Sequence, residues 1–162
     1  TPIKSSAASD VYKRQDKQEE MSKNLERYSL YEAYEVRQVL ETKAMDLIVR
    51  NATDSDLDEV ETAYQTMLLR FAETNTTTGE FELHQLYAKK TGSVFMEQTL
   101  NIVLSTILEM MHTTSHNVMD MHQVEEEKAD HRRIIDALHK RDSSAAQQAM
   151  YDHIQHTLDI LQ

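Results

Sequence analysis

The sequence contains no cysteine, one proline and two glycines in its 162 residues. Without cysteine, the chain forms neither disulfides nor thiolate metal sites, and a reducing, cytoplasmic location is predicted. Residues that break helices are scarce, whereas Leu, Met, Glu, Gln and Ala, which favour helices, are abundant. Hydrophobic residues make up 40% of the chain, which is long enough for one sizeable core. The composition therefore predicts an all-α fold.

Long apolar runs and a positive balance of charge are also missing. No run approaches the length of a membrane-spanning helix, and no stretch has the basic start and apolar core of a signal peptide. The net charge is -11 at pH 7. Because such a surface repels DNA and acidic membranes, we expect these residues to bind neither by themselves. The sequence has no Gly-x-Ser-x-Gly elbow and no glycine-rich phosphate loop, so it supports no catalysis beyond that of a metal.

The first 29 residues differ in character from the rest. Residues 1–15 begin with Thr and show no apolar period, and the run from Ser5 to Gln15 resembles translated adapter sequence at the end of a gene model. We expect either a non-native extension of a truncated gene model or a disordered native tail. Residues 16–29 are strongly polar and are predicted to form a linker or a frayed helix, with Ser29 capping the helix that follows.

Helical periodicity and capping residues predict about six helices joined by short loops in the remaining chain, 30–162. In chain order, they run from Leu30 to about Asn51, from a Thr53 cap through Phe71, from Glu80 to Lys90, from a Ser93 cap through Met111 with a break near Ser115, from about Val124 to Lys140, and from an Asp142 or Ser143 cap to the chain end. Helices of this length with short loops favour an antiparallel bundle.

Glu80 and His84 are spaced four residues apart, which places both side chains on one face of a helix. A carboxylate and an imidazole in this arrangement are two potential metal ligands. His131 and His153 each lie within an apolar stripe of a later helix, where a polar side chain costs about 1–3 kcal/mol unless it finds a partner. The pattern predicts that three helices bring these four residues into one metal site inside the bundle.

Three imidazoles and one carboxylate suit zinc, with nickel, manganese or another first-row divalent ion as alternatives. Such a set leaves one or more coordination positions open for water or for a carboxylate of a ligand. A hydrogen-bonded core residue is the plainer interpretation of each histidine taken alone, so the prediction depends on the four residues together.

Two other groups of residues compete for the metal. His112 and His116 are also four residues apart, with His122 nearby, although a surface cluster at a helix end is the simpler interpretation. Glu109 and His112 form the Glu-x-x-His half-motif of di-iron bundles, and the nearest second copy is the segment 136–139, with Asp in place of Glu. That pairing would make the protein a metal-dependent helical-bundle enzyme of the di-iron carboxylate type, which is the alternative function.

Arg37 falls inside the predicted apolar stripe of the first helix. The stripe consists of Ala33, Val36, Leu40, Ala44, Leu47 and Ile48. A buried guanidinium needs an anionic partner. Glu41, four residues later, would supply one within the helix. The other possibility is that Arg37 clamps the carboxylate of a bound ligand.

Several motifs follow one another in a defined order. Residues 37–41 read Arg-Gln-Val-Leu-Glu, residues 52–57 read Ala-Thr-Asp-Ser-Asp-Leu, and residues 131–153 open with His-Arg-Arg-Ile-Ile-Asp-Ala-Leu and close with Tyr-Asp-His. In order and spacing they resemble the C-terminal, effector-binding (FCD) domain of FadR-type transcriptional regulators in the GntR superfamily. The resemblance implies a helical ligand-binding domain over 30–162 that forms a homodimer and is not an enzyme.

In that family, the matching acid and three histidines bind one divalent metal, and the metal and an arginine of the first helix hold a small organic acid. The resemblance thus implies metal binding by Glu80, His84, His131 and His153, and effector binding by Arg37. Glu80 replaces the family's usual Asp, and its extra methylene lengthens its reach. The family's N-terminal winged helix-turn-helix is not among these residues, so DNA binding is expected only through that missing domain.

Overall fold

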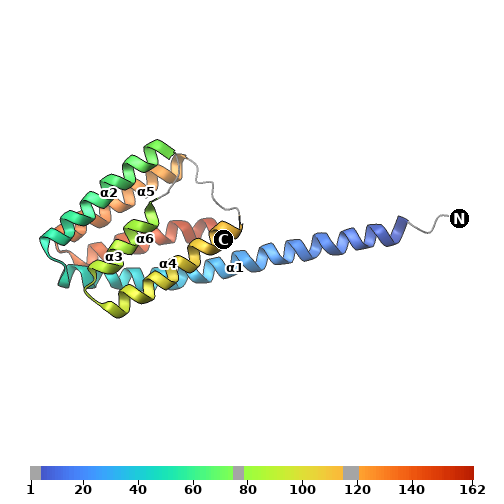
Figure 1. The fold of residues 1–162 in the computed structure, drawn as a ribbon, viewed down its shortest axis with the longest axis horizontal. Helices are drawn as coiled ribbons and strands as arrows, with labels where there is room; N and C mark the ends of the chain where they lie inside the picture. The colour runs from blue at the N-terminus through green and yellow to red at the C-terminus, as the bar shows by residue number, and fades with distance from the viewer. Residues whose placement is uncertain (1–4, 75–78, 115–120) are drawn as a thin grey trace.

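The computed structural model describes the backbone of residues 5–74, 79–114 and 121–162, and within these ranges the chain forms helices and no strand. In chain order, the helices are α1 (Ser5–Asn51), α2 (Asp54–Thr74), α3 (Glu80–Lys90), α4 (Val94–Thr114), α5 (Met121–His139) and α6 (Ser143–Leu161). The predicted all-α bundle is confirmed (Figure 1). None of the described helices is both long and apolar enough to cross a membrane.

The helices pack around one interior. α1 packs against α4 and α6, α5 lies along α2 and α6, and the short α3 packs against α1, α2 and α4 (Figure 1). Each helix contributes apolar residues at helical spacing, and on α2 the buried residues are Leu57, Val60, Tyr64, Met67 and Phe71. Burial of these stripes removes apolar surface from water and is the main force that holds the helices together.

Two of the predicted caps fix the beginnings of their helices. At the start of α2, Asp56 N donates to Thr53 Oγ1 at 3.1 Å, and Thr53 N donates to Asp56 Oδ2 at 2.8 Å, which is a reciprocal capping arrangement. At the start of α6, Ala145 N donates to Asp142 Oδ1 at 2.9 Å. α5 begins at Met121 rather than near Val124. The break predicted near Ser115 lies outside the described residues.

α1 begins at Ser5 and not at Leu30, so the N-cap predicted at Ser29 was wrong. The physical reason lies in the composition of the segment. Between Ser5 and Asn51 the sequence has neither proline nor glycine, and without such a residue no local signal ends or starts a helix. Residues 16–29 are therefore helical backbone continuous with α1. The separate roles predicted for residues 1–15 and 16–29 stay predictions.

The inward face of α1 differs from the predicted apolar stripe. Val36, predicted to be buried, is 52% exposed. The buried positions on these turns are instead Tyr34, Arg37 and Glu41. The predicted stripe was wrong at Val36 because this part of α1 buries the charged side chains of Arg37 and Glu41 instead. Their polar partners on α3 are Glu80 and His84, respectively.

Candidate metal centre

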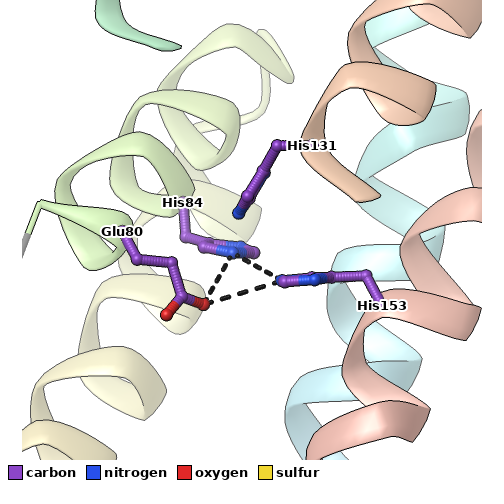
Figure 2. A group of neighbouring side chains, drawn as sticks. All are labelled: Glu80, His84, His131 and His153. Carbon is purple, nitrogen blue, oxygen red and sulfur yellow. Dashed lines mark hydrogen bonds and ion pairs between the residues drawn. The ribbon is translucent and has the colours of Figure 1, made fainter. Parts of the chain in front are cut away.

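The four side chains predicted to bind metal meet in the interior of the bundle (Figure 2). Glu80 and His84 project from α3, His131 from α5 and His153 from α6, and one potential ligand atom of each lies within 4.8 Å of the others. All four residues are buried, and the most exposed of them, Glu80, has only 6% of its surface accessible. It is the single group of this kind among the described residues.

The distances between these atoms suit a small divalent ion. His84 Nε2 lies 3.2 Å from His153 Nε2 and 3.4 Å from Glu80 Oε1, and Glu80 Oε1 lies 3.6 Å from His153 Nε2. Donor atoms at about 2.0–2.1 Å from a tetrahedral ion are separated from one another by about 3.4 Å. His131 Nε2 is buried without a hydrogen-bond partner in the described part of the chain. It offers a fourth donor, so the residues present fit the metal that the sequence predicts.

The outward ring nitrogens of two of the histidines contact buried residues that orient them. His84 Nδ1 hydrogen-bonds with Glu41 Oε2, and Glu41 Oε1 accepts a hydrogen bond of 2.6 Å from Arg37 Nε. The hydroxyl of Tyr87 lies 3.3 Å from His131 Nδ1. Contacts of this kind fix the rotation and tautomer of a metal-binding imidazole and leave Nε2 directed inward.

The third histidine has a carboxylate on its outward side. His153 Nδ1 lies 3.5 Å from Asp130 Oδ2, which is also 2.8 Å from His156 Nδ1. Arg133 donates to the other oxygen, Oδ1, of Asp130. Asp130 is therefore a buried carboxylate held in place by two side chains near the surface, and it in turn limits the rotation of His153.

Arg37 lies beside the metal donors, and Glu41, the partner predicted for it within the same helix, is paired with it. Besides its hydrogen bond to Glu41, its Nη2 lies 3.5 Å from Glu80 Oε1. Its guanidinium carbon is 5.2 Å from the ring centroids of both Tyr34 and Phe81. Burial raises the pKa of Glu41, but the charges of His84 and Arg37 outweigh it and lower that pKa to about 2. The Arg37–Glu41 pair is thus an ionised pair at the edge of the site.

Burial and charge also set the protonation of the donors. Burial, together with the charge of His153, lowers the pKa of His131 well below its usual value, so its ring is neutral at pH 7. Burial raises the pKa of Glu80, but hydrogen bonds with His153 and the charge of Arg37 hold it well below the usual value. Burial lowers the pKa of His153, but nearby carboxylates, Glu127 first, raise it to about 10. An ion bound here would therefore displace a proton from His153.

Besides Asp130, a second acidic residue at this site was not predicted from the sequence. Glu127 on α5 is 6% exposed, and its Oε2 lies 3.7 Å from His131 Nε2 and 3.6 Å from His153 Nδ1. Burial and the nearby charge of Glu80 raise the pKa of Glu127 to about 8. A signal was available, because Glu127 precedes His131 by four residues, the same spacing as that of Glu80 and His84.

The rival metal groups do not form a second centre in the part of the chain that the structure describes. The side chains of His112, His116 and His122 lie outside the described residues. Glu109 is exposed, and so are the acid and the histidine of the segment 136–139. The three described residues of the predicted di-iron pairing, Glu109, Asp136 and His139, therefore face solvent rather than the bundle interior.

Comparisons with known proteins agree with the sequence resemblance. The family model of the FCD domain matches residues 32–156. A structure of Streptococcus agalactiae GntR superposes with a TM-score of 0.68 at 22% identity, over 81% of this chain and 58% of that one. Escherichia coli McbR/YncC superposes with a TM-score of 0.65 at 16% identity, over 80% of this chain and 62% of that one. No curated protein matches the chain significantly.

The extent of the matches defines what the chain corresponds to. Both proteins share the fold of this chain. The chain spans about three fifths of the length of each of them. The family match covers most of the helical bundle, including all four candidate metal donors. The chain therefore belongs to the FCD domain family, whose members form C-terminal domains of GntR-type transcription regulators and are not enzymes.

Proposed function

We propose that this domain senses a small organic acid for a metabolite-responsive GntR/FadR-type transcription regulator, and that it does so with one bound divalent ion. The observation that carries the proposal is the convergence of Glu80, His84, His131 and His153 in a buried interior. Three ring nitrogens and a carboxylate oxygen, two of the rings oriented by hydrogen bonds and the third by a nearby carboxylate, are what such a centre requires.

The donor set favours zinc, and nickel or manganese are the alternatives. When bound, the ion would supply concentrated positive charge and coordination positions that the protein donors do not fill. In the folded chain, His84 and Glu80 would hold it from α3, His131 from α5 and His153 from α6. The roles of the remaining residues are to orient these donors and to balance their charge.

Arg37 supports an acidic effector. Its guanidinium lies beside Glu80, a candidate ligand of the ion, so two cationic groups would face the same space. A small mono- or dicarboxylate, such as a hydroxy acid or sugar acid, has the charge to lie between them. Glu41 accepts the hydrogen bond of Arg37 Nε, so the effector would be met by the Nη nitrogens at the edge of the guanidinium.

A thermal-shift experiment tests the proposal. The domain is stripped with a chelator, reloaded with zinc and screened against organic acids and matched neutral alcohols. Metal analysis should give about one ion per chain. Acids should stabilise the loaded protein by about 2.7 kcal/mol at 100 times their dissociation constant, and the effect should vanish after stripping. Stabilisation by neutral compounds alone, or equal stabilisation of the stripped protein, would contradict it.

A variant that keeps the positive charge at position 37 tests the role of Arg37 in this screen. Arg37→Lys preserves the positive charge beside Glu41 but loses the planar pair of donors. It should bind the metal with unchanged stoichiometry and respond less to acids. Arg50→Lys on the exposed side of α1 is the matched control. If Arg37→Lys responds to acids as the wild type does, the only role left for Arg37 is its ion pair with Glu41.

We also propose that the intact regulator is a homodimer that binds DNA through an N-terminal domain outside this sequence. The family supports this, and so do apolar side chains that remain exposed on neighbouring helices. Val39 on α1 is 70% exposed, and Phe95 and Ile102 on α4 are 81% and 68% exposed. Sedimentation at micromolar concentration should show a dimer, and a strict monomer would contradict the proposal for this domain.

A further inference from the structure

We propose that Phe81 is a positioning residue for Arg37, and that its ring, together with the ring of Tyr34, presents the guanidinium to the carboxylate of the effector. The inference rests on the proposed function and adds to it a residue of α3, the helix that carries two of the candidate metal donors. It is carried by the position of two aromatic rings over one buried guanidinium.

The two rings over the guanidinium of Arg37 come from different helices. The central carbon Cζ of Arg37 lies 5.2 Å from the ring centroid of Tyr34 on α1, and 5.2 Å from that of Phe81 on α3. A cation within about 6 Å of a ring centroid, over the face of the ring, is attracted by the negative charge of that face. Because Arg37 is only 1% exposed, water screens this attraction little.

The hydrogen bonds of Arg37 fix the plane of its guanidinium only weakly. Nε donates to Glu41 at 2.6 Å, whereas the contact of Nη2 with Glu80 is long, at 3.5 Å. One short hydrogen bond leaves a long side chain with considerable freedom to turn about it. A guanidinium stacks with its face against an aromatic ring, so the two rings restrict this rotation. They thereby hold the Nη nitrogens beside Glu80, where the effector is proposed to bind.

Tyr34 and Phe81 differ in what else accounts for their positions. Tyr34 is 4% exposed, and its hydroxyl lies 3.7 Å from Met111 Sδ on α4. Packing in the core therefore explains Tyr34 without a further role. Phe81 is only partly buried, and it lies at the edge of the core over a cation. Its contact with Arg37 is the feature of Phe81 that core packing alone does not require.

The place of Phe81 in the chain joins the arginine to the candidate metal centre. Phe81 directly follows Glu80, and His84 lies one helical turn from Glu80 on the same helix. An ion held by Glu80 and His84 would fix this turn of α3, and with it the ring over Arg37. The ion and the arginine would then meet the effector as one preorganised pair. Acid binding should therefore depend on Phe81, although its ring offers the ligand no polar atom.

The experiment compares the zinc-loaded wild type with Phe81→Leu and Phe81→Tyr. The first readout is the rate at which the Arg37 guanidinium rotates about its Nε–Cζ bond, measured by NMR from exchange between its Nη signals, which Arg37→Lys identifies by their absence. The second is the affinity for acetate, titrated against sodium chloride of equal ionic strength. Phe81→Leu should rotate about 5–30-fold faster and bind acetate about 5–30-fold more weakly, with unchanged zinc content. Phe81→Tyr keeps an aromatic face and should restore both values.

Two control variants separate the positioning of Arg37 from packing. Phe71→Leu makes the same change at a buried position of α2, and Phe95→Leu makes it at a position of α4 that is 81% exposed. The first should lower the free energy of unfolding in urea, and both should keep the wild-type rotation rate and acetate affinity. Should Phe81→Leu not fold, as judged by circular dichroism, Phe81→Met carries the same test, because it also lacks an aromatic face.

The outcomes that overturn the inference are distinguishable from failure of the proposed function. If the wild type binds acetate and Phe81→Leu leaves both readouts unchanged, Phe81 is a packing residue only, and the proposed function stands. The same conclusion holds if Phe71→Leu changes both readouts as much as Phe81→Leu does. If the zinc-loaded wild type binds no acetate, the proposed effector site fails, and this inference fails with it.

Discussion

His84 Nε2 and His153 Nε2 face each other at 3.2 Å, although 69 residues separate the two histidines in the sequence. Both nitrogens are directed inward because the other sides of the rings contact carboxylates, Glu41 for His84 and Asp130 for His153. Two such nitrogens at this distance share either a proton or a cation. The pair therefore links α3 to α6 through whatever occupies the space between them.

The metal content of histidine variants is the most direct prediction. His131→Ala removes the buried nitrogen that has no hydrogen-bond partner in the described structure, so it should lose most of the bound ion. His139→Ala changes a histidine of the same helix whose side chain is 38% exposed, and it should keep the ion. Elemental analysis of the two metal-loaded variants makes the comparison. Loss of the ion from His139→Ala alone would show that the wrong histidines were chosen.

Arg37 should contribute strongly to stability. Arg37→Met leaves Glu41 as a buried charge that has lost its guanidinium partner, and breaking such a pair costs about 3–5 kcal/mol. Arg50→Met removes an exposed pair with Asp46 on the same helix and should cost at most about 1 kcal/mol. Urea unfolding of the stripped variants measures both. Equal costs would mean that the buried pair contributes no more than a surface pair.

The pH dependence of stability should depend on Glu61. Its two oxygens each accept a hydrogen bond of 2.8 Å from Arg132, which joins α2 to α5. These hydrogen bonds lower the pKa of Glu61 to about 2, from an ordinary value of 4.5. Because the folded-state pKa is the lower one, the contribution is complete above the ordinary value and is lost as the pH falls toward 2.

The measurement is a difference between two proteins across that range. The free energy of unfolding of the wild type should exceed that of Glu61→Gln near neutral pH, and the difference should shrink as the solution is acidified. Glu73→Gln, an exposed acid on the same helix, is the control and should show a small difference at every pH. A wild-type advantage over Glu61→Gln that does not change with pH would refute the linkage.

The cap of α6 is expected to matter more than its exposed acids. Asp142→Ala removes the acceptor of the Ala145 N–H and should cost about 1 kcal/mol, within a range of about 0.5–2 kcal/mol. Asp159→Ala, near the other end of the same helix, removes only an exposed contact with Gln155 and should be nearly neutral. Thermal or urea unfolding compares them. If Asp142→Ala leaves the free energy of unfolding unchanged, water replaces the cap.

Local features of the chain were predictable, because their signals lie within a few residues. Thr53 and Asp142 mark helix starts through contacts with the next three residues. Gly79 and Gly92 both have positive φ, at 108° and 68°, and they bracket α3, whose bounds Glu80–Lys90 were predicted. The start of α1 was not predictable by the same means, since nothing near Leu30 interrupts the helix.

The composition of the site was only partly predictable. Glu80 and His84 stand out through their spacing, but Tyr87 and Asp130 become relevant only when the fold brings them to histidines of other helices. Tyr87, for example, meets a histidine 44 residues away. The face of α1 was misjudged for a related reason. A helix that buries charges such as Arg37 against another helix no longer follows the apolar period.

Arg37 and Glu41 belong to the same continuous helix as the segment that extends away from the bundle in Figure 1. From Arg37 back to Ser5, the helix rises about 48 Å at about 1.5 Å per residue. A rigid rod of this length converts a tilt of about 5° at the arginine into a displacement of about 4 Å at its far end. α1 is in this sense a lever arm. A rotation too small to disturb the packing around Glu41 becomes a translation that a distance measurement between labels at Ser5 and in α6 would register.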